Sequence, residues 1–494
     1  MLKYALGTQL QHKQSANIVM ITFWSQFASY GLNTILILFL TRPMLMHGLG
    51  YTQAKAYAFI GVSQATGYLM PILGGYMADQ VLGLRRSILL GSILLVFAYL
   101  LIMLSGMSIS EHGDTLFLAA YALTPAAGSL LMGTASAMVS RVYQDDDVKV
   151  KAAMTYYYMA INVGALLATM IAPSLLESRY GPLSVLALTF VGKAIAAFNF
   201  SSHYAIYDGI VWGKDRRSLS WQSVVHVTVY LMLIYGFTLF AFSHIFLASI
   251  IISIGCTAGM LWFLVKTFML QGVARTKQLI AVLLIMEAII FFIVYNQMST
   301  TLVLFAKHNT YTQFLGFHFS PAHYQLLNPL LIISLGLYLP NFYQKFPNFS
   351  IPYQFASGVI LASLALLVLG CAPAAQNGMI SGGYIAFTYV LITLAELWVS
   401  AIGLSMIGLY CDVKMLGFAM GAWYLASSLS NLFSGYLAHW VALPVHAVSA
   451  LESLSMYQTY YWSMGLGVLA VSALMMYAAF KLHQVLRYRG ITLP

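Results

Sequence analysis

The chain has 494 residues, of which 61% are apolar and only 7% are charged, with a formal net charge of +10. An ordinary soluble domain carries about 25% charged residues. A chain this apolar could not bury its hydrophobic surface in water, so the composition excludes the soluble enzyme classes and indicates lipid as the solvent.

Apolar segments of about 20 residues, the length that crosses a bilayer, recur along the chain. Six come first, a basic segment at 212–221 follows, then two spans joined by a short polar stretch, then six more. The sequence therefore predicts an N-terminal six-helix bundle at 1–210, a basic cytoplasmic loop with an inserted helix pair at 211–276, and a C-terminal six-helix bundle with a cytoplasmic tail at 277–494. The fourteen predicted spans are 18–40, 54–78, 87–106, 116–142, 152–176, 182–201, 221–241, 245–268, 278–304, 323–343, 353–371, 383–410, 416–441 and 459–481.

The basic residues predict the orientation of these spans. If the N-terminus is cytoplasmic, 18 of the 23 Lys and Arg residues fall in cytoplasmic segments, four fall outside, and Lys193 lies within a span. Cytoplasmic loops of membrane proteins carry this excess of Lys and Arg, so we expect both termini in the cytoplasm. The positive charge then faces anionic lipid, and no nucleic-acid partner is expected.

A stripe of polar side chains follows the first predicted span at steps of three and four residues, which places them on one helix face. Lipid cannot satisfy such a face. It lines either a water-filled cavity or a helix interface held by hydrogen bonds, and we interpret it as a cavity wall. The stripe consists of Thr22, Ser25, Gln26, Ser29, Tyr30 and Asn33.

Three charged residues lie well inside predicted spans, away from the span ends, where a charge requires a partner, a cavity or a path to the interface. Glu396 is predicted to carry a proton or bind an amine; the alternative is a structural carboxyl bonded to a neighbouring helix. Glu287 lies nine residues before Asn296, about 13 Å along a helix, and either titrates at another depth or has no role. Lys193 could pair with an acid or attract an anion, but we expect it to extend to the nearby cytoplasmic loop.

The loop after the second span carries Asp79, Arg85 and Arg86, for which we predict a gating contact that forms in one conformational state and breaks in the other. The alternative is that the arginines only set topology. No Walker loop, GxSxG elbow, HExxH or dinucleotide fingerprint is present, and the histidines show no metal-ligand spacing. We therefore expect neither an enzyme nor a cofactor nor a metal.

Four stretches carry a resemblance to a known family: PILGGYMADQVLGLRRSILLG at 71–91, YYYMAINVGALLA at 156–168, YNQMSTTLVLFAKHNT at 295–310, and ITLAELWVSAIGLSMIGL at 392–409. They resemble the proton-dependent oligopeptide transporters of the major facilitator superfamily. The resemblance implies an all-helical major-facilitator fold. It also implies proton-coupled peptide transport by alternating access, with a site between the halves near the membrane midplane.

The resemblance also assigns residues. It matches Tyr30, Tyr68, Asn162, Asn328 and Trp423 to pocket positions and makes Glu396 the group that binds a substrate amine. Separately from the resemblance, we predict proton coupling by Glu396 and Glu287, because they are the carboxylates that remain within the predicted spans. With the polar stripe, the predicted substrate-binding residues are Ser25, Gln26, Ser29, Tyr30, Asn33, Tyr68, Asn162, Asn296, Asn328, Glu396 and Trp423.

The sequence departs from the family where the family keeps charges. The first-helix motif ExxER aligns with 22–26, which holds no charge here, the fourth-helix lysine with Met132, and the seventh-helix glutamate with Asn296. The sequence therefore predicts an atypical member in a bacterial inner membrane. It would move a peptide-like, amine-bearing or neutral small molecule, with protons, rather than a dipeptide with a free carboxylate. The alternatives are an exporter or uncoupled facilitator of a non-peptide metabolite, such as a siderophore-like compound, and a transport-dead receptor or assembly partner.

Overall fold

The computed structural model describes residues 2–107, 113–143, 146–210, 213–216, 218–311, 313–314, 317–346, 349–444 and 448–488. Residues 211, 212 and 217 of the predicted linker and 489–494 of the predicted tail lie outside this set. The described chain is helical apart from a hairpin of two short strands, β1 (Gln313–Phe314) and β2 (Phe317–His318). It forms two compact units: Met1–Gly50 with Thr66–Ile245, and Tyr51–Ala65 with Phe246–Pro494.

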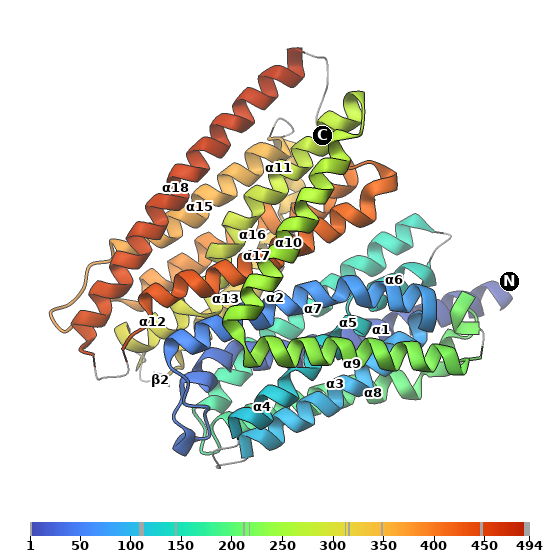
Figure 1. The fold of residues 1–494 in the computed structure, drawn as a ribbon, viewed down its shortest axis with the longest axis horizontal. Coiled ribbons are helices and arrows are strands. Elements are labelled where there is room, and N and C mark those ends of the chain that lie inside the picture. Colours follow the sequence, from blue (N-terminus) through green and yellow to red (C-terminus); the bar gives the residue numbers. More distant parts are fainter. Residues whose placement is uncertain are drawn as a thin grey trace. The chain divides into compact units, whose positions relative to one another are not determined.

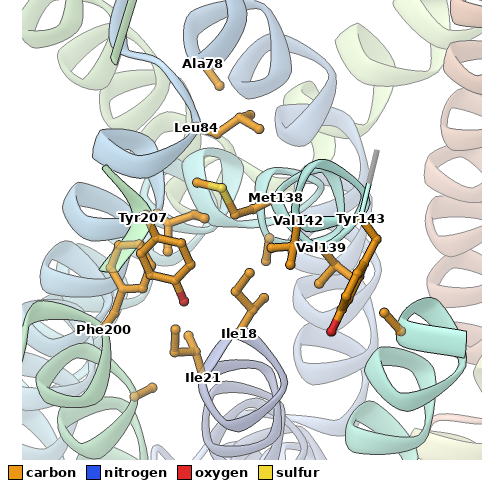
Figure 2. Packing of buried hydrophobic residues seen from close by; sticks show 14 residues of the cluster. Ile18, Ile21, Ala78, Leu84, Met138, Val139, Val142, Tyr143, Phe200 and Tyr207 are labelled. Carbon is orange, nitrogen blue, oxygen red and sulfur yellow. The ribbon is translucent and has the colours of Figure 1, made fainter. Parts of the chain in front are cut away.

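In the first unit, α1 lies against α7 and α8, and α3 lies against α5 and α8 (Figure 1). One cluster of buried apolar side chains joins α1, α6 and α8 and includes Ile18, Met138 and Phe200 (Figure 2). The elements of this unit are α1 (Leu2–Thr41), η1 (Met44–Met46), the second half of α2 (Gln53–Met77), η2 (Ala78–Leu82), α3 (Leu84–Met107), α4 (Gly113–Tyr121), α5 (Leu123–Leu131), α6 (Thr134–Val142), α7 (Asp147–Leu176), α8 (Pro182–Ser202), η3 (Tyr204–Tyr207), η4 (Gly213–Arg216) and α9 (Trp221–Ser243).

In the second unit, α15 lies along α18 and α16, and α11 packs against α17 (Figure 1). The elements of this unit are the first half of α2, α10 (Ile245–Phe268), α11 (Gly272–Tyr295), η5 (Asn296–Ser299), α12 (Thr301–Asn309), the hairpin, η6 (Pro321–Leu326), α13 (Leu327–Gly336), α14 (Leu339–Lys345), α15 (Ile351–Gly370), α16 (Gly382–Tyr410), η7 (Val413–Met415), α17 (Leu416–Ala438), η8 (His439–Val441) and α18 (Ala450–Tyr488).

Eleven helical segments of the described chain are long and apolar enough to cross a membrane. The expected all-helical membrane fold is thus confirmed, whereas the count of fourteen spans is not. The three expected spans that are not among the eleven, 54–78, 323–343 and 416–441, are nonetheless largely helical. The span expected at 323–343 consists of η6, α13 and α14 in succession, so no single helix there reaches bilayer length.

Two further predicted spans are interrupted. The segment 116–142 divides into α4, α5 and α6; between α5 and α6, Met132 is extended and Gly133 has a φ of +86°. The Thr134 hydroxyl donates to the carbonyls of Leu130 and Leu131, at 2.7 and 2.9 Å, and so satisfies groups that the break exposes. The segment 278–304 is interrupted by the tighter turn η5 between α11 and α12.

Three helices show how the chain is divided between the two units. α2 contributes its residues up to Ala65 to the second unit and the rest to the first. Of the inserted pair, α9 belongs to the first unit, where the Thr238 hydroxyl donates to the Ala122 carbonyl at 2.7 Å. α10 belongs, from Phe246 on, to the second, where the Trp262 and Phe418 rings have centroids 4.5 Å apart. His244 alone separates the two helices.

Candidate functional site

Lys193 lies in the first unit and is 3% exposed, so the expectation that it extends to the cytoplasmic loop is wrong. Its ammonium donates to the Ser25 carbonyl at 2.7 Å, the Ser25 hydroxyl at 2.9 Å and the Ser29 hydroxyl at 2.8 Å. The Tyr99 ring centroid is 4.9 Å from Nζ. Within the described residues no carboxylate pairs with this lysine, and its three donors are all satisfied by neutral groups.

The close approach of α1 and α8 brings these groups together. A Cβ at Gly31 would lie 3.1 Å from the Thr189 methyl, and a Cβ at Gly192 would lie 3.1 Å from the Ala28 Cβ. Small residues at such a crossing allow membrane helices to approach and to form polar contacts. Lys193, next to Gly192, therefore reaches across to the polar stripe of α1.

The polar stripe is heterogeneous in the structure. Thr22 and Ser25 are buried; the Thr22 hydroxyl has no hydrogen-bond partner within the described residues. The remaining stripe residues, Gln26, Ser29, Tyr30 and Asn33, are half-buried. Ser25 therefore takes part in a contact between helices, one of the two expected roles, while the cavity-wall role of the half-buried members stays a prediction.

In the second unit, Asn328 and Glu396 come together from α13 and α16. The Asn328 side-chain amide donates to the Glu396 carboxyl at 2.6 Å and to the Thr393 hydroxyl at 3.2 Å. The Tyr295 hydroxyl also hydrogen-bonds the Glu396 carboxyl. Glu396 is half-buried, so a carboxyl held in a polar cluster still has surface with which to meet a cation or a proton.

Asn296 begins the turn η5, where α11 ends. Its side-chain nitrogen is buried and has no hydrogen-bond partner within the described residues. The next residue, Gln297, is fully buried; it donates to the Ser434 hydroxyl at 2.8 Å and accepts from the Tyr460 hydroxyl at 3.1 Å. Gln297 therefore ties the interrupted helix to α17 and α18, a role that the sequence did not reveal.

Of the four other predicted residues, three are buried and one is half-buried. Glu287 is buried in α11 and forms no ion pair within the described residues. Trp423 is buried, with its ring centroid 5.7 Å from that of Phe292. Asn162 is buried and donates to the Tyr158 carbonyl of its own helix at 3.0 Å, whereas Tyr68 is half-buried.

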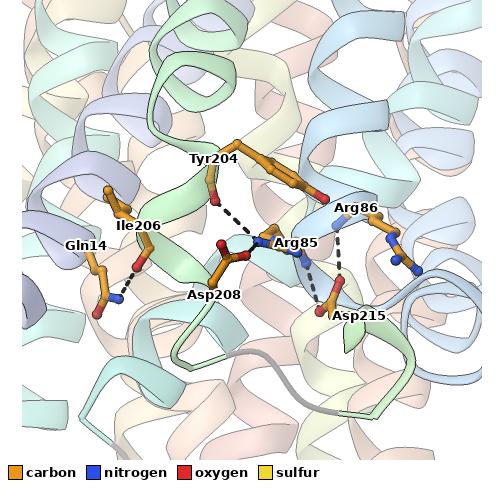
Figure 3. A network of polar contacts seen from close by, with 7 residues as sticks. All are labelled: Gln14, Arg85, Arg86, Tyr204, Ile206, Asp208 and Asp215. Atoms are coloured by element: carbon orange, nitrogen blue, oxygen red, sulfur yellow. Dashed lines mark hydrogen bonds and ion pairs between the residues drawn. The ribbon is translucent and has the colours of Figure 1, made fainter. Parts of the chain in front are cut away.

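The expected gating residues differ in their surroundings. Asp79 is exposed. Arg85 pairs with Asp208, donates to the Tyr204 carbonyl at 3.5 Å, and stacks its guanidinium 4.2 Å from the Tyr204 ring centroid (Figure 3). Arg85 therefore binds the segment that follows α8, and its partners could not be predicted from the loop after the second span alone.

Asp215, in η4, accepts hydrogen bonds from the backbone amides of Arg85 at 3.2 Å and Arg86 at 3.4 Å (Figure 3). These amides belong to the first turn of α3, so the carboxylate caps that helix from a distant segment. Gly83 precedes the helix with a φ of +86°, and a Cβ there would lie 2.3 Å from the Asp215 carboxyl carbon. The glycine is required by both its backbone conformation and its neighbour.

A cavity of about 780 Å³ lies within the second unit between α11, α18 and the end of α17. Its walls are mostly apolar and include Ile290, Trp440, Met456 and Val468. None of the predicted site residues lines it. The cavity and the Asn328–Glu396 cluster are therefore separate features of the second unit.

Comparison with known proteins identifies the family. The model of the POT family matches residues 85–462. The dipeptide and tripeptide permease A of Serratia proteamaculans is 32% identical over 493 residues, which cover 97% of this chain and 94% of the permease. The permease of the same name from Chromobacterium violaceum is 32% identical, with 94% of this chain and 93% of the permease covered.

Solved structures agree. A proton-dependent oligopeptide transporter studied for substrate recognition is 25% identical, with a TM-score of 0.82 over 96% of this chain and 100% of the other. A tetrameric PepTSo2 structure, 24% identical, has a TM-score of 0.84 over 96% of this chain and 99% of the other, and supports the fold alone. The expected major-facilitator fold is thereby confirmed. The chain belongs to the POT family, and it is a membrane transporter rather than an enzyme.

Proposed function

We propose that this transporter moves di- and tripeptides, together with protons, across the bacterial inner membrane by alternating access of its two units. The relatives named dipeptide and tripeptide permeases support the substrate class. The excess of basic residues in the segments expected to face the cytoplasm supports cytoplasmic termini. The domain division at 1–210, 211–276 and 277–494 remains part of this proposal.

The observation that carries the proposal is the cluster of Asn328, Glu396 and Tyr295 in the second unit. The Glu396 carboxyl accepts from two neutral hydrogen-bond donors and is paired with no cation within the described residues. A peptide amino group is the cation that fits such a site, and a proton is the smaller alternative. The same carboxyl can therefore link substrate binding to proton transfer.

The remaining predicted residues enter as proposals of the same kind. Gln26, Tyr30, Asn33 and Tyr68 would contact substrate from the first unit, and Asn162, Asn296 and Trp423 would shape its surroundings. Glu287 would be a second proton-coupling group. Asp79, Arg85 and Arg86 would act in gating, with the Arg85–Asp208 pair and the Asp215 cap as contacts that change between states.

Uptake into proteoliposomes tests the function. The wild type should accumulate dialanine when the outside is more acidic, and a protonophore should abolish the accumulation. Glu396→Gln should lose gradient-driven accumulation by more than tenfold yet retain exchange of labelled for unlabelled dialanine, because the amide can still accept a hydrogen bond. Glu177→Gln, at the exposed end of α7, is the control. Normal gradient-driven uptake by Glu396→Gln would refute the role of this carboxyl.

A further inference from the structure

The half-buried Ser29 hydroxyl in α1 has a hydrogen to donate and a buried cation behind it. Its oxygen accepts from the Lys193 ammonium at 2.8 Å and from the Tyr99 hydroxyl at 3.5 Å. A hydroxyl has one proton to give as well as two lone pairs. Within the described residues the Ser29 hydroxyl donates no hydrogen bond, unlike the Thr34 hydroxyl, which donates to the Tyr30 carbonyl of its own helix at 2.6 Å.

The charge behind Ser29 makes it a strong donor. Hydrogen bonds in a chain polarise one another when the local dielectric is low, and an ammonium that donates to a hydroxyl oxygen makes the hydroxyl hydrogen more positive. Lys193 is 3% exposed and pairs with no carboxylate within the described residues, so no neighbouring anion offsets the charge of its protonated form. A lysine inside a membrane span costs roughly 2.5–3.5 kcal/mol on membrane insertion scales. A role in filling space alone would not explain why a lysine occupies this position.

We propose that Ser29, polarised by Lys193, forms an anionic subsite that receives the carboxylate of a peptide substrate. The subsite presents a hydroxyl donor and the field of a buried ammonium, while the ammonium itself stays covered. The uncharged 22–26 segment and Met132 led to the expectation that peptides with a free carboxylate are not transported. A subsite on the polar stripe of α1 replaces that expectation. This inference rests on the proposed peptide function and assigns the residues that bind the carboxylate end of the substrate.

Binding of dialanine and of its C-terminal amide to the purified transporter tests the subsite. The two ligands share an amino group and differ only in the terminal carboxylate. The wild type should bind the free acid at least roughly tenfold more tightly than the amide, as expected for a hydrogen bond to a charged group. Ser29→Ala and Lys193→Met should lose that preference while binding the amide like the wild type.

Control variants separate this role from packing. Ser105→Ala removes a buried hydroxyl of α3 that donates to the Ile102 carbonyl at 2.7 Å, and Lys151→Met removes an exposed lysine; both should keep the preference. Loss of affinity for both ligands alike in Ser29→Ala would show a structural role and overturn the assignment. If Lys193→Met does not fold, Ser29→Ala alone still tests the proposal.

The remaining outcomes are distinguishable. Equal binding of acid and amide by the wild type would overturn this inference and leave peptide transport standing, whereas binding of neither would refute the proposed function itself. An inorganic anion has the same chemistry as a carboxylate. If replacing gluconate by chloride stabilises the wild type against heat as much as dialanine does, the subsite belongs to a free anion and the assignment to substrate is wrong.

Discussion

Asp215 and Asp208 both contact the Arg85 residue, yet their surroundings give them different energetic roles. Asp215 is 2% exposed and accepts from two amides of α3, whereas the Asp208 side chain is 68% exposed and pairs with the guanidinium. A buried cap leaves helix amides unsatisfied when it is lost. Only the Asp208 end of the pair is exposed, since the Arg85 side chain is 10% exposed, and water and salt weaken the contribution of an exposed carboxylate.

We therefore predict that Asp215→Ala lowers the free energy of unfolding by about 1–2 kcal/mol, the usual cost of losing a helix cap. Asp208→Ala should cost at most about 1 kcal/mol. Gly83→Ala should resemble Asp215→Ala, because the added methyl group would occupy the space of the carboxylate. Thermal unfolding of the three variants in detergent measures the difference. Equal loss in the two aspartate variants would contradict the capping role.

Single residues also show where sequence patterns stop being informative. The steps of three and four residues correctly placed Ser25 and Ser29 on one face of a helix. They could not show that α8 brings Lys193 against that face, because the partner of a helix face depends on tertiary packing. The family resemblance assigned Asn328 and Glu396 separately to the pocket, and the structure shows that these two side chains are in contact.

At the scale of elements, α2 and α17 cross with their backbones unusually close. A Cβ at Gly61 would lie 2.9 Å from the Asn431 carbonyl oxygen, and a Cβ at Gly435 would lie 2.8 Å from the Tyr57 carbonyl oxygen. The Ser428 hydroxyl donates to the Ala65 carbonyl at 3.0 Å, further along the same crossing. Small residues at such a crossing are the means by which membrane helices associate.

This crossing predicts a position-specific effect of one methyl group. Gly61→Ala should destabilise the transporter by about 1–3 kcal/mol, because overpacking forces the two helices apart. Gly67→Ala, in the same helix with open space around the added carbon, should be neutral or slightly stabilising. Melting temperatures of the two variants provide the measurement. A Gly61→Ala variant as stable as Gly67→Ala would show that the close approach of α2 and α17 is not needed.

Helix positions were predictable because a bilayer requires about 20 apolar residues in each span. The interruptions within spans were not predictable in this way, because the segment that holds Met132 and Gly133 is as a whole long and apolar enough to count as one span. Glycine and proline occur throughout membrane helices without breaking them, so Gly133 gave no distinctive signal. Asn296 was singled out through the family comparison, whereas the turn η5 that it begins emerged only from the structure.

At the scale of the whole chain, the two units do not follow the order of the sequence. The first half of α2 belongs to the second unit, and the inserted helices α9 and α10 are divided between the units. Hydropathy could predict six, two and six spans because that pattern is local. It could not assign a helix to a unit, because such an assignment depends on contacts such as Thr238 with Ala122 and Trp262 with Phe418.

The division of the inserted pair leads to a prediction about His244, the only residue between its helices. Each helix has its own contacts within its unit: the Tyr230 and Ser129 hydroxyls are 2.8 Å apart, and Trp262 packs on Phe418. We therefore expect a four-residue Gly-Ser insertion after His244 to leave dialanine uptake within about twofold of the wild type, since an added flexible segment changes loop closure by under 1 kcal/mol. Uptake reduced more than tenfold in a variant with an unchanged melting temperature would instead make the short connection part of the transport cycle, because the two helices would then have to move together.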